Sequence, residues 1–193
     1  MPKWKMLRKN GESDILNGIF LRLHDFSGGF VMSVEKVRSC LAQVGMESRL
    51  TVFEVSSATV ELAAKALGVE AARIAKSISF YDREDGCLLI VTAGDGKIDN
   101  AKFKSEFGYK AKMLSRDDVE RLTGYRVGGV CPFDNPPEAK VYCDVSLKRF
   151  DWVYPAGGSD NSCVKLTCDE LFRISGAVKW IDVCKSMEGS ATA

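Results

Sequence analysis

Alternating apolar and polar residues give the clearest structural signal of the chain between positions 73 and 80. Successive side chains of a strand point to opposite faces. One face of this predicted strand would carry three large apolar residues and a lysine: Ile74, Lys76, Ile78 and Phe80. The other face would be smaller and more polar: Ala75, Ser77, Ser79 and Tyr81. A lysine on an inward face either snorkels its head to water or sits desolvated beside a cleft, and the second arrangement marks a functional candidate.

Similar patterns predict further elements on both sides of this strand. Helical spacing and terminal glycines predict helices at 33–45, 59–68, 100–107, 115–124 and 167–174. The predicted N-caps of the last four are Thr59, Asp99, Ser115 and Thr167. In the second helix, Leu62, Ala63, Ala66 and Leu67 would form the packed face. Strands are predicted at 50–55, 87–92, 110–114, 141–145, 150–154, 163–166 and 178–183. The strand at 87–92 is almost continuously apolar and would be central.

The order of these elements predicts an α+β domain with a mixed sheet rather than a doubly wound parallel fold. The length of 193 residues fits one domain. Residues 1–31 are poorly patterned and read as an N-terminal extension, with Met32 as a possible natural start and Ser33 as the first helix cap. The domain would occupy 32–185, and 186–193 would be a loose tail.

Composition narrows the function classes. Hydrophobic residues make up 46% of the chain, enough for a core, and the net charge is only +1. Binding to nucleic acid would therefore need a local basic patch. Two candidates are the basic stretch 3–9 and the lysine-containing stretch 102–112; a solvated face is the alternative for both, and it is favoured for the first. The sequence contains no run that suits a membrane span or signal peptide, so a cytoplasmic protein is expected.

Cysteine and histidine usage argues against several chemistries. The seven cysteines form no Cys-x-x-Cys pair, and His24 is the single histidine. This spacing predicts no zinc site, and reduced thiols in the cytosol are expected. A Cys–His or Ser–His–Asp nucleophile system would depend on His24, which lies in the poorly patterned region. We therefore expect neither a metal nor a cofactor.

Glycine-rich segments supply the remaining candidates. The turn at 93–97 lacks the Gly-Lys-Ser/Thr ending of a P-loop. The stretch 123–133 contains Gly124, Gly128, Gly129 and Pro132. Such glycines let a backbone approach a ligand and offer N–H groups to an oxyanion. An ordinary connecting loop is the simpler alternative. The pair Gly157-Gly158 has the same two interpretations.

Taken together, these motifs resemble the YbaK/EbsC family, also called the prolyl-tRNA synthetase-associated or INS-type editing domain. The resemblance runs from about residue 33 to residue 183. The segments that carry it are Thr59 to Gly68, Ile74-Ala75-Lys76-Ser77, Gly94 to Asp99, Thr123-Gly124-Tyr125, Gly128 to Phe133, Asp144, Phe150-Asp151 and Ala156-Gly157-Gly158. It implies a mixed β-sheet, curled toward a barrel, with short helices around it. It also implies hydrolysis of the ester that links a wrong amino acid to the 3′ end of a tRNA.

The resemblance assigns roles residue by residue. Lys76 matches the family's essential lysine, and Gly128 to Pro132 matches its GxxxP loop, so Lys76, Gly128 and Gly129 are the expected catalytic residues. The expected substrate-binding residues are Ser77, Tyr125, Val130, Cys131, Pro132, Asp144, Gly157 and Gly158. The chain departs from the family pattern in two places. Cys131 stands where a serine or another small residue is usual, and Phe53-Glu54-Val55 occupies the region of a typical histidine-containing segment.

The implied substrate is tRNA-Pro carrying Ala, Cys or another small amino acid, and prolyl-tRNA synthetase is a possible partner. The family allows attack assisted by the substrate itself, so no protein base is required. Two other interpretations remain open. The first is a non-catalytic module that binds tRNA ends or a synthetase with the same pocket. The second is a structural domain in which Lys76 snorkels to water.

Overall fold

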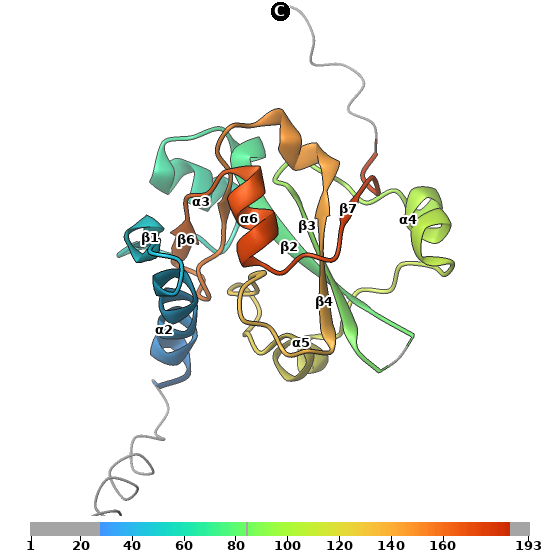
Figure 1. The fold of residues 1–193 in the computed structure, drawn as a ribbon, viewed down its shortest axis with the longest axis horizontal. Coiled ribbons are helices and arrows are strands. Elements are labelled where there is room, and N and C mark those ends of the chain that lie inside the picture. The colour runs from blue at the N-terminus through green and yellow to red at the C-terminus, as the bar shows by residue number, and fades with distance from the viewer. Residues whose placement is uncertain (1–27, 84, 186–193) are drawn as a thin grey trace, which may run out of the picture.

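A five-stranded mixed sheet forms the centre of the protein (Figure 1). The computed structural model describes residues 28–83 and 85–185, with backbone only for 28–32. The strand order is β5-β2-β3-β4-β7. The bounds are β2 Ile74–Tyr81, β3 Cys87–Ala93, β4 Ala139–Asp144, β5 Tyr154–Pro155 and β7 Trp180–Ile181. A separate two-stranded sheet pairs β1 (Leu50–Val52) with β6 (Ser162–Val164).

The β2–β3 hairpin is the longest pairing in the sheet. It is antiparallel, from Ala75 opposite Ala93 to Tyr81 opposite Cys87. The other neighbours, β5 beside β2, β4 beside β3 and β7 beside β4, run parallel. Every residue of β3 is buried, which confirms the central strand predicted from its continuous apolar run.

Helices cover both faces of this sheet. They are α2 Gly28–Ala42, α3 Val60–Leu67, α4 Asn100–Phe107, α5 Arg116–Thr123 and α6 Cys168–Ile174, with short 3₁₀ turns at Glu47–Arg49, Ala71–Arg73 and Val145–Arg149. Alternation along β3 divides the core in two. Leu89 and Val91 pack with residues of α2, α5 and α6, whereas Leu88 and Ile90 pack with Phe103 of α4. Figure 1 shows α4 at one side of the sheet and α2, α3 and α6 at the other.

Local signals placed most helix ends correctly. The predicted caps Thr59, Asp99, Ser115 and Thr167 each accept a hydrogen bond from a backbone N–H of the first turn. Gly68 and Gly124 end their helices in the left-handed conformation. The mixed α+β architecture expected from the sequence is confirmed, whereas its barrel-like curl stays a prediction.

Several predicted boundaries are wrong, and one predicted helix face is only partly confirmed. The first helix begins at Gly28, not at Ser33, because glycines are tolerated in a first turn, whose N–H groups have no intrahelical acceptor. The expected strand at 110–114 contributes only the bridge Met113–Phe80, and the strands at 50–55, 150–154 and 178–183 are shorter or shifted. In α3, Ala63 is buried and Leu67 partly buried, as predicted, but Leu62 and Ala66 are exposed. Ala64 is buried instead, because tertiary packing shifts the buried face of the helix.

The interpretation of 1–31 as an extension falls outside the described residues, except that 28–31 belong to α2. The predicted tail at 186–193 also lies outside them. In the described part of the chain, no helix is long and apolar enough to cross a membrane.

Candidate functional site

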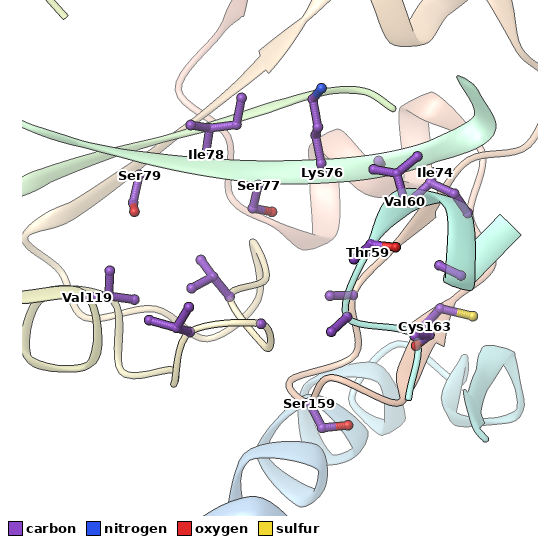
Figure 2. A pocket seen from close by; sticks show the side chains of 18 of the residues that line it. Thr59, Val60, Ile74, Lys76, Ser77, Ile78, Ser79, Val119, Ser159 and Cys163 are labelled. Carbon is purple, nitrogen blue, oxygen red and sulfur yellow. The ribbon is translucent and has the colours of Figure 1, made fainter. Parts of the chain in front are cut away.

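A cavity of about 360 Å³ lies on the face of β2 that carries Ser77 and Ser79 (Figure 2). Its walls come from β2, the segment 57–60 before and at the start of α3, residues 113–119, the loop 127–130 and the segment 154–163. These elements are distant in sequence and meet only in the fold. The volume lies at the low end of the range for small-molecule sites.

Lys76 is positioned by β2 at the edge of this cavity, but its head lies on the other side of the strand. Figure 2 shows the Lys76 and Ser77 side chains pointing in opposite directions. The Lys76 Nζ donates a hydrogen bond to the Gly94 carbonyl oxygen at 2.9 Å. Burial lowers the pKa of Lys76, and the nearby acidic groups Asp95 and Glu61 oppose this effect. The glycine turn at 93–97 therefore serves as the acceptor for this lysine.

Ser77 has the most unusual environment of the cavity wall. Its Oγ is enclosed and has no hydrogen-bond partner, a property shared among the described residues only with Asn135 Oδ1. Ser77 lines the cavity and Asn135 does not. Around Ser77 the lining is mainly apolar, including Ala75, Val119 and Val130.

Within the glycine loop, residues that line the cavity have backbone N–H groups without a partner in the described part of the chain. Gly128 has a φ of +93°, lines the cavity, and its N–H makes no hydrogen bond within the described part of the chain. The N–H of Gly129 instead donates to the Arg126 carbonyl oxygen at 2.9 Å. A Cβ on Gly129 would lie 2.9 Å from the Gly158 carbonyl oxygen, so glycine is needed there for close backbone packing.

Three predicted substrate-binding residues of this segment are buried and do not line the cavity. Tyr125 is fully buried, and its hydroxyl donates to the Phe133 carbonyl oxygen at 2.5 Å. Cys131 and Pro132 are also buried and do not line the cavity, whereas Val130 does. Burial raises the pKa of the Cys131 thiol to about 12. The buried Tyr125 hydroxyl thus joins the two ends of the segment 125–133 through its hydrogen bond to Phe133.

Asp144, at the end of β4, likewise does not line the cavity. It is fully buried, and its two carboxylate oxygens accept hydrogen bonds from Ser146 N–H at 2.9 Å and Val183 N–H at 2.8 Å. These bonds join the end of β4 to the strand-like segment after β7. The observed contacts of Asp144 are therefore structural.

Gly157 and Gly158 shape a turn and do not line the cavity themselves. A Cβ on Gly157 would lie 2.5 Å from Leu50 Cδ1, and one on Gly158 would lie 2.5 Å from the Ser33 carbonyl oxygen. Their close packing places the following segment, with Ser159 and Ser162, at the cavity wall.

Sequence reasoning missed these two serines. The Ser159 Oγ lies 2.6 Å from Ser162 Oγ and 2.8 Å from Asn161 Oδ1, so both hydroxyls already have partners. For Ser159, the position directly after the glycine pair was an available signal. The lining residues Arg116, Met113 and Val127 were also missed; all three side chains are exposed.

Among the described residues, the cysteine thiols are poorly suited to act as nucleophiles, and no metal centre is indicated. All seven cysteines are free, and burial raises the pKa of Cys143, Cys163 and Cys184 to about 12, which disfavours thiolates. No cluster of three or more His, Cys, Asp or Glu side chains suitable for a metal occurs in the residues described. His24 lies outside them.

Comparison with known proteins identifies the class. The model of the aminoacyl-tRNA editing domain matches residues 54–174, and the chain belongs to this family. The family expected from the lysine strand and the glycine loop is thereby confirmed. The matched range includes all the segments that line the cavity.

The individual relatives agree with this assignment. The uncharacterized protein YwhH of Bacillus subtilis is 52% identical over 81% of this chain and 100% of its own length. The multifunctional Ser/Thr-tRNA deacylase ProXp-y of Escherichia coli is 29% identical over 71% of this chain and 85% of its length. A crystal structure described as a candidate trans-editing enzyme for prolyl-tRNA synthetase superposes with a TM-score of 0.72 and 26% identity, covering 84% of this chain and all of that one.

Proposed function

We propose that this protein is a free-standing trans-editing deacylase, which hydrolyses the ester between a wrong amino acid and the 3′ end of a tRNA. The observation that supports this most directly is that β2, which carries Lys76, and the loop around Gly128 line the same cavity. The family assignment and the deacylase named above favour the same reaction.

Gly128 is the best-placed group for stabilising the tetrahedral intermediate. Its unpaired N–H at the cavity wall can donate to the developing oxyanion. Since Gly129 N–H is already bonded, our proposal assigns the oxyanion role to Gly128 and a packing role to Gly129. An aminoacyl ester is already activated, so positioning and charge stabilisation can drive hydrolysis without a protein base.

Lys76 would hold negative charge of the substrate at the cavity edge. An ammonium group has three donors, and among the described residues the Lys76 head uses one of them, on Gly94. The others can bind the terminal phosphate of the tRNA, whereas the ester carbonyl is assigned to Gly128 on the cavity face of β2. Partial burial strengthens such a contact because less water competes.

The finer substrate assignment is also a proposal. We expect tRNA-Pro carrying Ala, Cys or another small amino acid, because the cavity is small and the resemblance implies that tRNA. Part of proline–tRNA ligase of Lactobacillus helveticus is 29% identical to 68% of this chain, which spans 23% of that ligase. This similarity supports a test for association with prolyl-tRNA synthetase.

The deciding experiment measures single-turnover deacylation of tRNAs mischarged with Ala, Cys, Ser or Thr, using the wild type and Lys76→Ala. Lys65→Ala is the matched control, since Lys65 is exposed on α3, does not line the cavity and lies outside both candidate basic stretches. We expect cleavage of at least one substrate by the wild type and the control, and loss in Lys76→Ala. Binding of the tRNA end or the synthetase without turnover would support the non-catalytic module instead.

A further inference from the structure

The mouth of the cavity carries exposed apolar side chains that the proposed chemistry does not use. Met113 and Val127 both line the cavity, and they are 65% and 54% exposed. Other lining residues, such as Val119, are buried, so their exposure marks Met113 and Val127 as residues of the mouth. One exposed apolar side chain is ordinary on a protein surface, but two at the opening of the same cavity form a candidate contact surface for a ligand.

Arg116 adds an unpaired positive charge to the same mouth. Its side chain is exposed, lines the cavity and makes no hydrogen bond, ion pair or ring contact with the described residues. The next two arginines along the chain do have partners: Arg121 bonds Asp118, and Arg126 pairs with Glu120 at 3.5 Å. The donors of the Arg116 guanidinium group are therefore available to a ligand.

The covalent structure of the substrate determines what would lie at this mouth. The aminoacyl ester is bonded to the ribose of the terminal nucleotide, and Val127 directly precedes Gly128, whose N–H we assign to the oxyanion. With the aminoacyl group inside the cavity, the ribose and base of that nucleotide come to lie at the opening. A nucleobase has two apolar faces and a polar edge, so it suits aliphatic side chains beside a guanidinium group.

We propose that Met113, Arg116 and Val127 form a subsite for the base of the terminal nucleotide of the tRNA. The inference rests on the proposed function, because it places the aminoacyl group in the cavity behind this mouth. Met113 and Val127 would pack against a face of the base, and the Arg116 guanidinium would donate to acceptor nitrogens along its edge. The protein would thus distinguish an aminoacyl-tRNA end from a simple ester of the same amino acid.

Equilibrium binding of two synthetic RNA hairpins with the acceptor stem of tRNA-Pro tests this subsite. One hairpin ends in adenosine, and the other ends in the same ribose without its base. We expect the wild type to bind the first roughly three- to tenfold more tightly, and Arg116→Ala and the double variant Met113→Ala/Val127→Ala to lose this preference. Arg121→Ala and Val178→Ala are the matched controls that should keep it, because both side chains are exposed and neither lines the cavity.

A second set of measurements separates contact with the base from general attraction to phosphate. In the deacylation of mischarged tRNA, Arg116→Ala should raise KM about three- to tenfold and leave kcat nearly unchanged, because the contact does not involve the reacting atoms. Arg116→Lys keeps the charge but loses the planar group with its fixed donors, so it should not restore the preference for the terminal base. Full restoration by lysine would overturn the assigned base contact of Arg116.

The outcomes distinguish this subsite from the proposed function. Equal binding of the two hairpins by the wild type, or an unchanged preference in either the Arg116→Ala or the double variant, would overturn the subsite. Deacylation accompanied by such a result would leave the proposed function standing. A preference for the terminal base without any deacylation would refute the proposed function and leave the subsite, and binding of neither hairpin would also overturn the subsite.

Discussion

Lys76 and Ser77 are neighbours in the sequence, yet their side chains lie on opposite faces of β2 (Figure 2). The Lys76 Nζ bonds the Gly94 carbonyl oxygen, on the face where Ile78 and Phe80 pack toward the α4 layer. The Ser77 Oγ is enclosed on the cavity face. The pleat of one strand thus separates a positive charge from a neutral hydroxyl, so substitutions at the two positions should have separable effects.

Substituting Lys76 with Met should remove activity while preserving the fold. The methionine keeps an apolar stem along the strand but loses the ammonium group. We expect deacylation to fall at least about a hundredfold, the usual scale for losing one charge-stabilising donor. Single-turnover kinetics and a thermal melt on the same sample check this. Full activity in Lys76→Met would exclude Lys76 from the reaction, whereas a large fall in melting temperature would indicate a structural role.

Alanine substitutions at Gly128 and Gly129 should impair different properties: Gly129→Ala should lower stability, and Gly128→Ala should lower activity. At Gly129 the new Cβ would overlap the backbone of Gly158 and Ser159, so we expect a loss of about 1–3 kcal/mol in the free energy of unfolding. At Gly128 the nearest atom, Asp160 Cβ, is 3.4 Å away, but a φ of +93° is strained for alanine. Relieving that strain would redirect the N–H, so Gly128→Ala should lose mainly activity.

Urea denaturation and deacylation rates, measured on both variants, test this contrast. A Gly129→Ala protein as stable as the wild type would contradict the packing role of Gly129. An active Gly128→Ala protein would contradict the oxyanion role of Gly128.

Asp144→Ala should destabilise the protein rather than weaken substrate binding alone. The backbone N–H groups of Ser146 and Val183 both donate hydrogen bonds to Asp144, and both would lose their partner. Hydrogen bonds to a charged acceptor contribute about 1.5–3 kcal/mol each, so a loss of several kcal/mol in the free energy of unfolding is expected. Asp144→Asn keeps one acceptor oxygen and should lose less. A stable Asp144→Ala with impaired substrate binding would restore the role first expected from the resemblance.

Stability should decrease at alkaline pH because buried thiols resist ionisation. Burial raises the pKa of Cys163 from 9.0 to about 12. Between these values the folded protein holds a proton that the unfolded chain releases, so the stabilising contribution is complete below pH 9 and is lost as pH rises toward 12. The slope from one such thiol is at most about 1.4 kcal/mol per pH unit. Chemical denaturation at pH 8, 9 and 10 should show a shallower decline in Cys163→Ala than in the wild type, and identical slopes would contradict the assignment.

The sequence by itself determined the local features of this protein. The alternation at 73–80, the four helix caps and the continuous apolar run at 87–92 each depend on neighbouring residues, and each produced the expected element. The lysine motif and the glycine loop also sufficed to indicate the editing family, because their order along the chain is itself a sequence property.

Only the tertiary structure decided which residues meet and which already have partners. Sequence placed Tyr125, Cys131 and Asp144 among the substrate-binding residues, whereas packing buries them away from the cavity. It gave no sign that Ser159 and Ser162 pair, or that the Ser77 hydroxyl has no partner. Such properties depend on contacts between segments far apart in the chain. The pattern of a single segment cannot encode them, because the same residue types fit a structural loop and a binding site equally well.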